Sequence, residues 1–175
     1  WHLGAAAAGP NEQVARALEA SAERARQRGG SSAAAVYLWR AAELTPDPGR
    51  ASERLLEAAR AELVAGHGPQ AREILDRARA SGLGTEHDAD AAWTEALIHI
   101  VAGNVREPAA LLAGALPRIG ASDTETAAGV CAAADAVVLA GGHLVKEPTR
   151  RTIASGTLTV IDRCQIGEPL AKLFA

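Results

Sequence analysis

The chain has 175 residues, 48% of them hydrophobic and only 3% aromatic, and a formal net charge of −3 at pH 7. This charge argues against a nucleic-acid surface or a polybasic membrane patch, both of which need a basic excess. No apolar run approaches the roughly 20 residues of a membrane span, and no signal peptide opens the chain, so we expect a cytoplasmic protein without direct contacts to nucleic acid or membrane.

The apolar residues are mostly Ala, Leu and Val, and Ala and Leu are strong helix formers. We therefore expect an all-α protein. Arg far outnumbers Lys, which indicates a GC-rich, bacterial coding sequence. The chain begins at Trp1 and contains no Met, so we interpret it as a fragment of a longer polypeptide.

Helix signals recur along the chain at a steady spacing. A Pro or a capping side chain opens most segments and Gly closes them, the usual asymmetry of helix ends. Asn11 with Pro10 is expected to open the first helix, Ser31 and Ser32 to cap the second, and Ser122 to cap the seventh. The pattern predicts helices at about residues 12–28, 31–44, 48–65, 69–80, 85–102, 106–119 and 122–140.

The terminating glycines carry the strongest signal. Gly29, Gly66 and Gly103 are 37 residues apart, twice, and a fixed period in this range indicates stacked repeats. Small or apolar residues recur at fixed offsets from each glycine, as expected where two helices cross closely. The matched sets are Ala34, Ala71 and Pro108; Leu38, Leu75 and Leu112; Ala41, Ala78 and Ala115; and Ala22, Ala59, Ala96 and Ala133.

Gly29, Ala34, Leu38, Ala41 and Pro46 resemble the second half of a tetratricopeptide repeat. The resemblance implies an all-α, right-handed superhelix (an α-solenoid) of helical hairpins over residues 1–155, followed by a C-terminal segment at 156–175. It departs from the family in its period of 37 and in lacking the large aromatic residue of the first helix. The expected repeats are about 11–47, 48–84, 85–121 and 122–155.

A second resemblance rests on longer stretches. The run "RAAELTPDPGRASERLLEAARAELVAG", with "ALEASAERARQRGG" before it and "AREILDRARA" after it, resembles the central region of large ATP-dependent LuxR-type transcriptional regulators, the MalT-related signal-transduction ATPases. The likeness is close from residue 1 to about residue 80, and beyond it only the spacing of the helix signals agrees. The resemblance implies a nucleotide-binding module before this region and a helix-turn-helix module after it.

The chain itself contains no G-x-x-x-x-G-K-[ST] phosphate loop and no basic recognition helix. The nearest Gly–Lys stretch, at 140–149, has the wrong spacing. We therefore expect neither an enzyme nor a cofactor or metal site in this chain, and we interpret it as the regulatory or protein-interaction arm of such a regulator. The alternatives are a stand-alone interaction scaffold and, more remotely, a helical enzyme.

Several residue types that can carry chemistry occur in the sequence. Glu86, His87, Asp88 and Asp90 are better explained by the dipole at a helix start than by a metal. His99 is interpreted as a packing residue, His67 and His143 as solvated residues at helix ends, and Cys131 as a buried thiol. No Ser, His and Asp arrangement supports catalysis, and Cys164 carries no prediction.

In the tetratricopeptide register, the first helix of each hairpin lines a concave groove. This groove is predicted to bind a protein or peptide, other modules of the same polypeptide, or a small effector, and to become more apolar along the chain. The alternative is a shifted register that makes these residues core. The groove residues are Arg16, Glu19, Glu23 and Arg26; Glu53, Leu56, Arg60 and Leu63; and Asp90, Trp93, Leu97 and Ile100.

The C-terminal tail is ambiguous. Residues 157–161 have the β-branched alternation of a strand, but a helix imposed by tertiary context is an equal alternative. Gly167 and Pro169 interrupt the pattern, and residues 169–175 are interpreted as the start of a further helix.

Overall fold

The computed structural model describes residues 9–104, 106–119, 127, 129–134, 137 and 146–164. All regular structure among these residues is helical, which confirms the all-α prediction for this part of the chain. The chain forms two compact units, residues 1–87 and 88–175, called unit 1 and unit 2 below. A superhelix running through both units stays a prediction.

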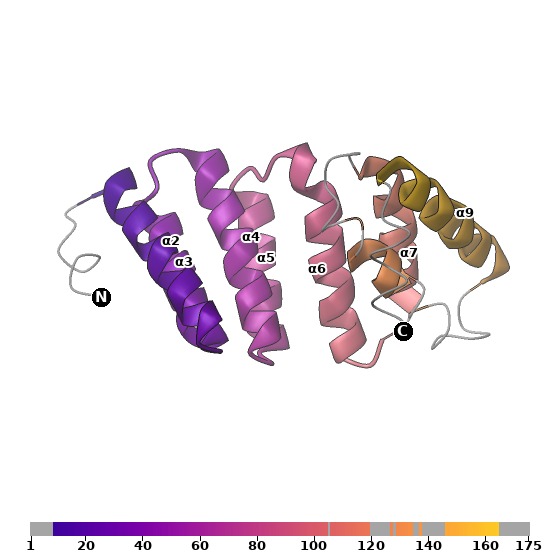
Figure 1. Ribbon diagram of the computed structural model, residues 1–175, viewed down its shortest axis with the longest axis horizontal. Coiled ribbons are helices and arrows are strands. Elements are labelled where there is room, and N and C mark those ends of the chain that lie inside the picture. The colour runs from indigo at the N-terminus through magenta and orange to yellow at the C-terminus, as the bar shows by residue number, and fades with distance from the viewer. Residues whose placement is uncertain are drawn as a thin grey trace. The chain divides into compact units, whose positions relative to one another are not determined.

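Unit 1 contains two helical hairpins. The first consists of α2 (Glu12–Gln27) and α3 (Ser31–Leu44), and the second of α4 (Pro48–Val64) and α5 (Gly68–Ala80). Each helix packs against the next along the chain, so that α3 lies against both α2 and α4 (Figure 1). The two expected repeats at 11–47 and 48–84 each hold one of these hairpins.

The predicted capping side chains are present at some helix starts of unit 1 and absent at others. The Asn11 side chain accepts a hydrogen bond from the Val14 amide at 3.1 Å, and Asp47 caps α4 in the same way, with Pro48 in the first turn. The prediction that Ser31 and Ser32 cap the second helix is wrong. Gly30 occupies the N-cap of α3 without a side-chain cap, because the helix already begins at Ser31.

The three glycines spaced by 37 residues end their helices in the same way. Gly29, Gly66 and Gly103 have φ values of 76°, 86° and 80°, in the left-handed region that favours glycine. Around each one, two backbone hydrogen bonds close a Schellman motif. The amides one position after the glycines, in residues 30, 67 and 104, donate to the carbonyls of residues 25, 62 and 99 at 2.9 Å. The repeat is therefore present in the backbone as well as in the sequence.

Replacing Gly66 with Ala is expected to lower the free energy of unfolding by about 1 kcal/mol, because an L-residue strains the left-handed backbone. A Cβ at this position would meet nothing within 4 Å, so the loss reports the backbone alone. Gly68 lies two residues on, in the first turn of α5, and Gly68→Ala is the matched control with no comparable loss. Urea unfolding of both variants checks this, and equal effects would contradict it.

The residues that recur at fixed offsets from the three glycines are buried. Among the leucines, Leu75 and Leu112 are fully buried, and Leu38 is 5% exposed. The same holds for the other matched sets: Ala34, Ala71 and Pro108; Ala41, Ala78 and Ala115; and Ala22, Ala59, Ala96 and Ala133. Buried alanines permit the close approach of neighbouring helices within each hairpin.

Unit 1 ends in the short 3-10 turn η1 (Thr85–His87). Unit 2 contains α6 (Asp88–Val101), α7 (Arg106–Ala115), the 3-10 turn η2 (Leu116–Arg118) and α9 (Glu147–Cys164). The described residues between 127 and 137 are also helical. The fifth and sixth predicted helices thus exist, each with one end in a 3-10 turn. The core of the unit includes Ala96, Leu112, Leu116, Ile119, Val130, Cys131, Val137, Ile153 and Val160.

The strand interpretation of residues 157–161 is wrong, since these residues continue α9. Ile153, Thr157 and Val160 are buried at spacings of four and three residues, the period of a helix face. Helix α9 runs through residues 155 and 156, where the C-terminal segment is expected to begin, and the domain boundary stays a prediction.

Parts of several predictions lie outside the described residues. These are the Ser122 cap, the end of the seventh helix, His143, and the interpretation of 169–175 as a further helix. Much of the fourth expected repeat, 122–155, also lies outside the described residues. In the portion of the chain that is described, no helix is long and apolar enough to cross a membrane.

Candidate binding site

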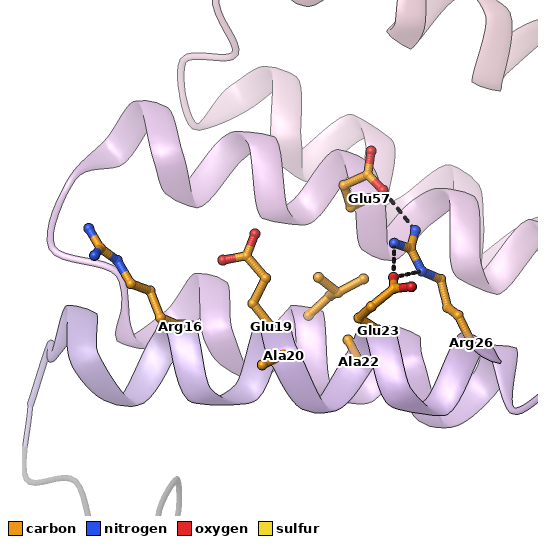
Figure 2. A pocket seen from close by; sticks show the side chains of 8 residues that line it. Arg16, Glu19, Ala20, Ala22, Glu23, Arg26 and Glu57 are labelled. Atoms are coloured by element: carbon orange, nitrogen blue, oxygen red, sulfur yellow. Dashed lines mark hydrogen bonds and ion pairs between the residues drawn. The ribbon is translucent and has the colours of Figure 1, made fainter. Parts of the chain in front are cut away.

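A pocket of about 490 Å³ lies in unit 1 beside α2. Its wall on α2 is formed by side chains one helical turn apart, and Leu38 of α3 and Glu57 of α4 complete it (Figure 2). Arg16 and Arg26 lie at opposite ends, with Glu19 and Glu23 between them. The lining residues are Arg16, Glu19, Ala20, Ala22, Glu23, Arg26, Leu38 and Glu57.

One end of the pocket is closed by an ion cluster. Arg26 Nε donates to Glu23 at 3.0 Å, and its Nη1 donates to Glu57 of α4 at 3.4 Å. Gln27 donates to the other oxygen of Glu23 at 3.0 Å, and Arg60 donates to the other oxygen of Glu57 at 3.0 Å. Both carboxylates are thus already engaged at each oxygen, and this end is electrostatically balanced.

A buried arginine holds the pocket's wall in place. Arg54 of α4 is 2% exposed, and its guanidinium donates to both oxygens of Glu12, each at 2.9 Å. It also donates to Glu19 at 2.9 Å and to the hydroxyl of Thr45, which itself donates to the Ala41 carbonyl. One cation therefore joins α2 to α4, because a guanidinium can engage two carboxylates at once.

This arrangement changes the proton affinity of its members. The hydrogen bonds from Arg54, aided by Arg16 and opposed by partial burial, lower the pKa of Glu12 to about 2. The same hydrogen bonds with Glu12, and then those with Glu19, raise the pKa of Arg54 above its ordinary value. Both groups are ionised across the neutral range, so the link between α2 and α4 is permanently charged there.

Replacing Glu12 with Gln is expected to lower the free energy of unfolding by about 1 kcal/mol at neutral pH, after allowance for the partial exposure of this carboxylate. A depressed folded-state pKa gives stability that is complete above the unfolded pKa, near 4.5, and lost as pH falls towards about 2. The gap between wild type and Glu12→Gln should therefore narrow from pH about 5 to about 2.5. Urea unfolding across this range checks it, and a constant gap would contradict it.

The other end of the pocket keeps groups that can bind a ligand. Arg16 is 75% exposed in its side chain, and its Nε bonds to Glu12 at 3.0 Å, while its two terminal nitrogens have no hydrogen-bond partner among the described residues. Glu19 uses one oxygen for Arg54, and its other oxygen lies 3.9 Å from Arg50. The pocket thus offers hydrogen-bond donors and an acceptor beside the small Ala20 and the buried Leu38.

The structure brings together only the first part of the predicted groove. Arg16, Glu19, Glu23 and Arg26 all line the pocket. Glu53 and Arg60 lie on α4 and are half-buried, Glu53 in an ion pair with Arg50 and Arg60 in one with Glu57. Leu56, predicted in the groove, is buried at 2% exposure instead.

The apolar part of the predicted groove lies elsewhere. Trp93, Leu97 and Ile100 pack, partly buried, against the core of unit 2. The Trp93 ring lies so close to Gly129 that a Cβ there would come within 2.3 Å of it. This packing agrees with the alternative of a shifted register. Asp90 is half-buried in the first turn of α6, and a partner-binding role for these four residues stays a prediction.

The histidines, acidic residues and cysteine that the sequence offers as candidates for chemistry lie in different parts of the helical structure or at a helix start. Glu86 and His87 lie in η1, and Asp88 and Asp90 lie in the first turn of α6. The helix dipole stabilises acidic side chains at this end of a helix. Among the described residues, no three His, Cys, Asp or Glu side chains gather as metal ligands would. His99 is half-buried on α6, and Cys131 is a buried free thiol.

Sequence reasoning missed Glu12, Arg54, Thr45 and Glu57. The repeat gives no signal for Arg54, because the matching residues 37 positions before and after it are Ala17, which is exposed, and Ala91, which is buried. Its partners lie 35 and 42 residues away, and no local pattern identifies them.

In the described part of the chain, fold and pocket together define a protein of helices packed in sequence as antiparallel pairs, with a charged pocket in unit 1. Comparison with protein-family models, with curated proteins and with solved structures finds no match. The function therefore has to be argued from the residues and the geometry.

Proposed function

We propose that this chain is a non-catalytic helical-repeat arm that binds a protein segment or an effector within an ATP-dependent LuxR-type transcriptional regulator. The observation that carries the interaction role is the pocket beside α2, held by Arg54 on a scaffold whose hairpins repeat every 37 residues. The assignment to this class of regulator rests on the sequence resemblance of residues 1–80.

The pocket supports binding because its two ends differ. At one end, Arg26, Glu23 and Glu57 satisfy one another, so a ligand gains little there. At the other end, the terminal nitrogens of Arg16 and one oxygen of Glu19 are accessible to a polar group. A partner that presents polar groups to Arg16 and Glu19 and an apolar group to Ala20 and Leu38 would match this wall.

Regulation by such an arm follows from differential affinity. A ligand shifts an equilibrium between a closed and an active form only when it binds the two forms unequally. If other modules of the same polypeptide occupy the pocket in the closed form, an effector that competes for Arg16 and Glu19 releases them.

Site-specific photocrosslinking tests the proposal in the full-length protein in cells. A benzophenone amino acid replaces Ala20, which is exposed in the pocket wall, or Ala33, which is exposed on α3 outside the pocket lining. We expect a defined crosslinked product from position 20 and none from position 33, with the attached peptide identified by mass spectrometry. Equal products at both positions, or none at either, would contradict a binding role for the pocket.

The same experiment separates the two classes of interaction protein. A crosslink within the polypeptide, to its nucleotide-binding module, supports the regulator arm. A crosslink to one separate protein, from a polypeptide that carries no such module, favours a stand-alone scaffold, which the same pocket would equally serve.

A further inference from the structure

The second helices of the two hairpins in unit 1 share an exposed face. The guanidinium carbon of Arg77, on α5, lies 4.5 Å from the centre of the Trp39 ring on α3, so the two helices lie side by side at this point. Trp39 is half-buried, and Val36, one turn before it on α3, is 46% exposed. Glu73 lies one turn before Arg77 on α5 and is exposed. These four residues are called the α3–α5 face below.

Arg77 is held in position while its hydrogen-bonding groups stay unused. Stacking on the indole covers one side of the guanidinium plane and leaves the nitrogens at its edge for other partners. Glu73 lies four residues earlier, a spacing at which opposite charges commonly pair on a helix. Within the described part of the chain, however, neither Glu73 nor Arg77 has an ion-pair or hydrogen-bond partner. The face therefore presents a cation and an anion that are both exposed and unpaired.

This order of charges is complementary to itself. When two copies of α5 lie antiparallel about a two-fold axis midway between positions 73 and 77, Arg77 of each copy lies opposite Glu73 of the other. Asp76 is also exposed, but it does not disturb this pattern, because adjacent residues do not share a helix face. A second copy of the same helix thus supplies both charges that the face requires, in the right order.

The α3 part of the face suits an interface between proteins. Aromatic residues and arginine are enriched among the residues that dominate binding energy, and Trp39 already fixes the Arg77 side chain before any partner arrives. Val36 adds exposed apolar surface on the same side of α3. Arg40 and Glu43, at helical spacing from Val36 and Trp39, pair with each other at 2.8 Å and add no net charge.

We propose that the α3–α5 face joins two copies of this chain in a symmetric dimer, in which Arg77 of each copy pairs with Glu73 of the other. The dimer goes beyond the proposed function and does not depend on it, because none of the four face residues lines the pocket beside α2.

Analytical ultracentrifugation of the complete chain tests the dimer. We expect the weight-average mass to rise towards twice the monomer mass with concentration, and added salt to weaken association because it screens the ion pairs. Arg77→Glu and Glu73→Arg should each weaken self-association about tenfold, since like charges then face each other and two-fold symmetry counts each contact twice.

A mixture of the two single variants is the sharpest arm of the test. One variant then carries two cations on α5 and the other two anions, so the two should associate with each other although neither associates well with itself. Arg28→Glu is the matched control, because Arg28 is exposed at the C-cap of α2, outside the face, and should leave association unchanged.

A chain that stays monomeric at every concentration would overturn the proposal. A dimer that neither charge reversal weakens, or a mixture of the two variants that associates no better than each alone, would overturn it as well.

Discussion

Replacing Arg54 with Met is expected to lower the free energy of unfolding by about 3 kcal/mol, the largest loss for any single charge in unit 1. Met fills the volume of the arginine stem but supplies none of its hydrogen bonds. Two carboxylates, Glu12 and Glu19, and the buried Thr45 hydroxyl lose their shared donor. Both carboxylates lie on α2 and are then left without the cation that α4 supplies to them.

Arg50→Met is the matched control for this substitution. Arg50 lies one turn earlier on α4, is 51% exposed, and reaches Glu19 only at 3.9 Å, so its removal should cost less than about 0.5 kcal/mol. Arg54→Lys should fall between the two, because a single ammonium cannot span both carboxylates. Urea unfolding at neutral pH measures all three, and equal losses for Arg54→Met and Arg50→Met would refute the structural role of Arg54.

Replacing Leu75 with Ala is expected to lower the free energy of unfolding by about 3 kcal/mol. Leu75 is fully buried and occupies the repeat position shared with Leu38 and Leu112. Truncation removes apolar contact and leaves a cavity that a close-packed interior fills only in part.

Val64 provides the contrast for this second substitution. It ends α4, is also a large aliphatic residue, and is 76% exposed, so Val64→Ala should change stability by less than about 0.5 kcal/mol. Thermal or urea unfolding of the two variants checks the difference. Similar small effects from both would show that the 37-residue periodicity does not mark the core.

The periodic features could be predicted because each has a local physical cause. A left-handed helix end requires glycine, so Gly29, Gly66 and Gly103 identify the ends of the first helices without tertiary information. Close crossings require small residues, so alanines at the same offset, such as Ala41 and Ala78, identify the packing faces.

Where the sequence left two alternatives open, contacts distant in sequence distinguish them. Residues 157–161 have strand-like composition, but the buried spacing of Ile153 and Val160 within unit 2 selects a helix. Trp93 occupies a groove position in the tetratricopeptide register, yet it packs against Gly129, 36 residues later. Without knowledge of that neighbour, an apolar groove and a packed core have the same sequence pattern.

One wall of the candidate site could be predicted from the sequence, and the rest could not. Arg16, Glu19 and Glu23 recur at helical spacing on one face of α2, so their common orientation follows from the sequence. The pocket they line also needs Leu38 and Glu57 from the next two helices, whose positions follow from tertiary packing alone.

The coding sequence on both sides of this region is the measurement that tests the regulator-arm account most directly. The account predicts one reading frame that encodes a phosphate-binding loop upstream of residue 1 and a helix-turn-helix module downstream of residue 175. A frame that ends close to both termini without either module would contradict the regulator arm and leave a stand-alone interaction scaffold.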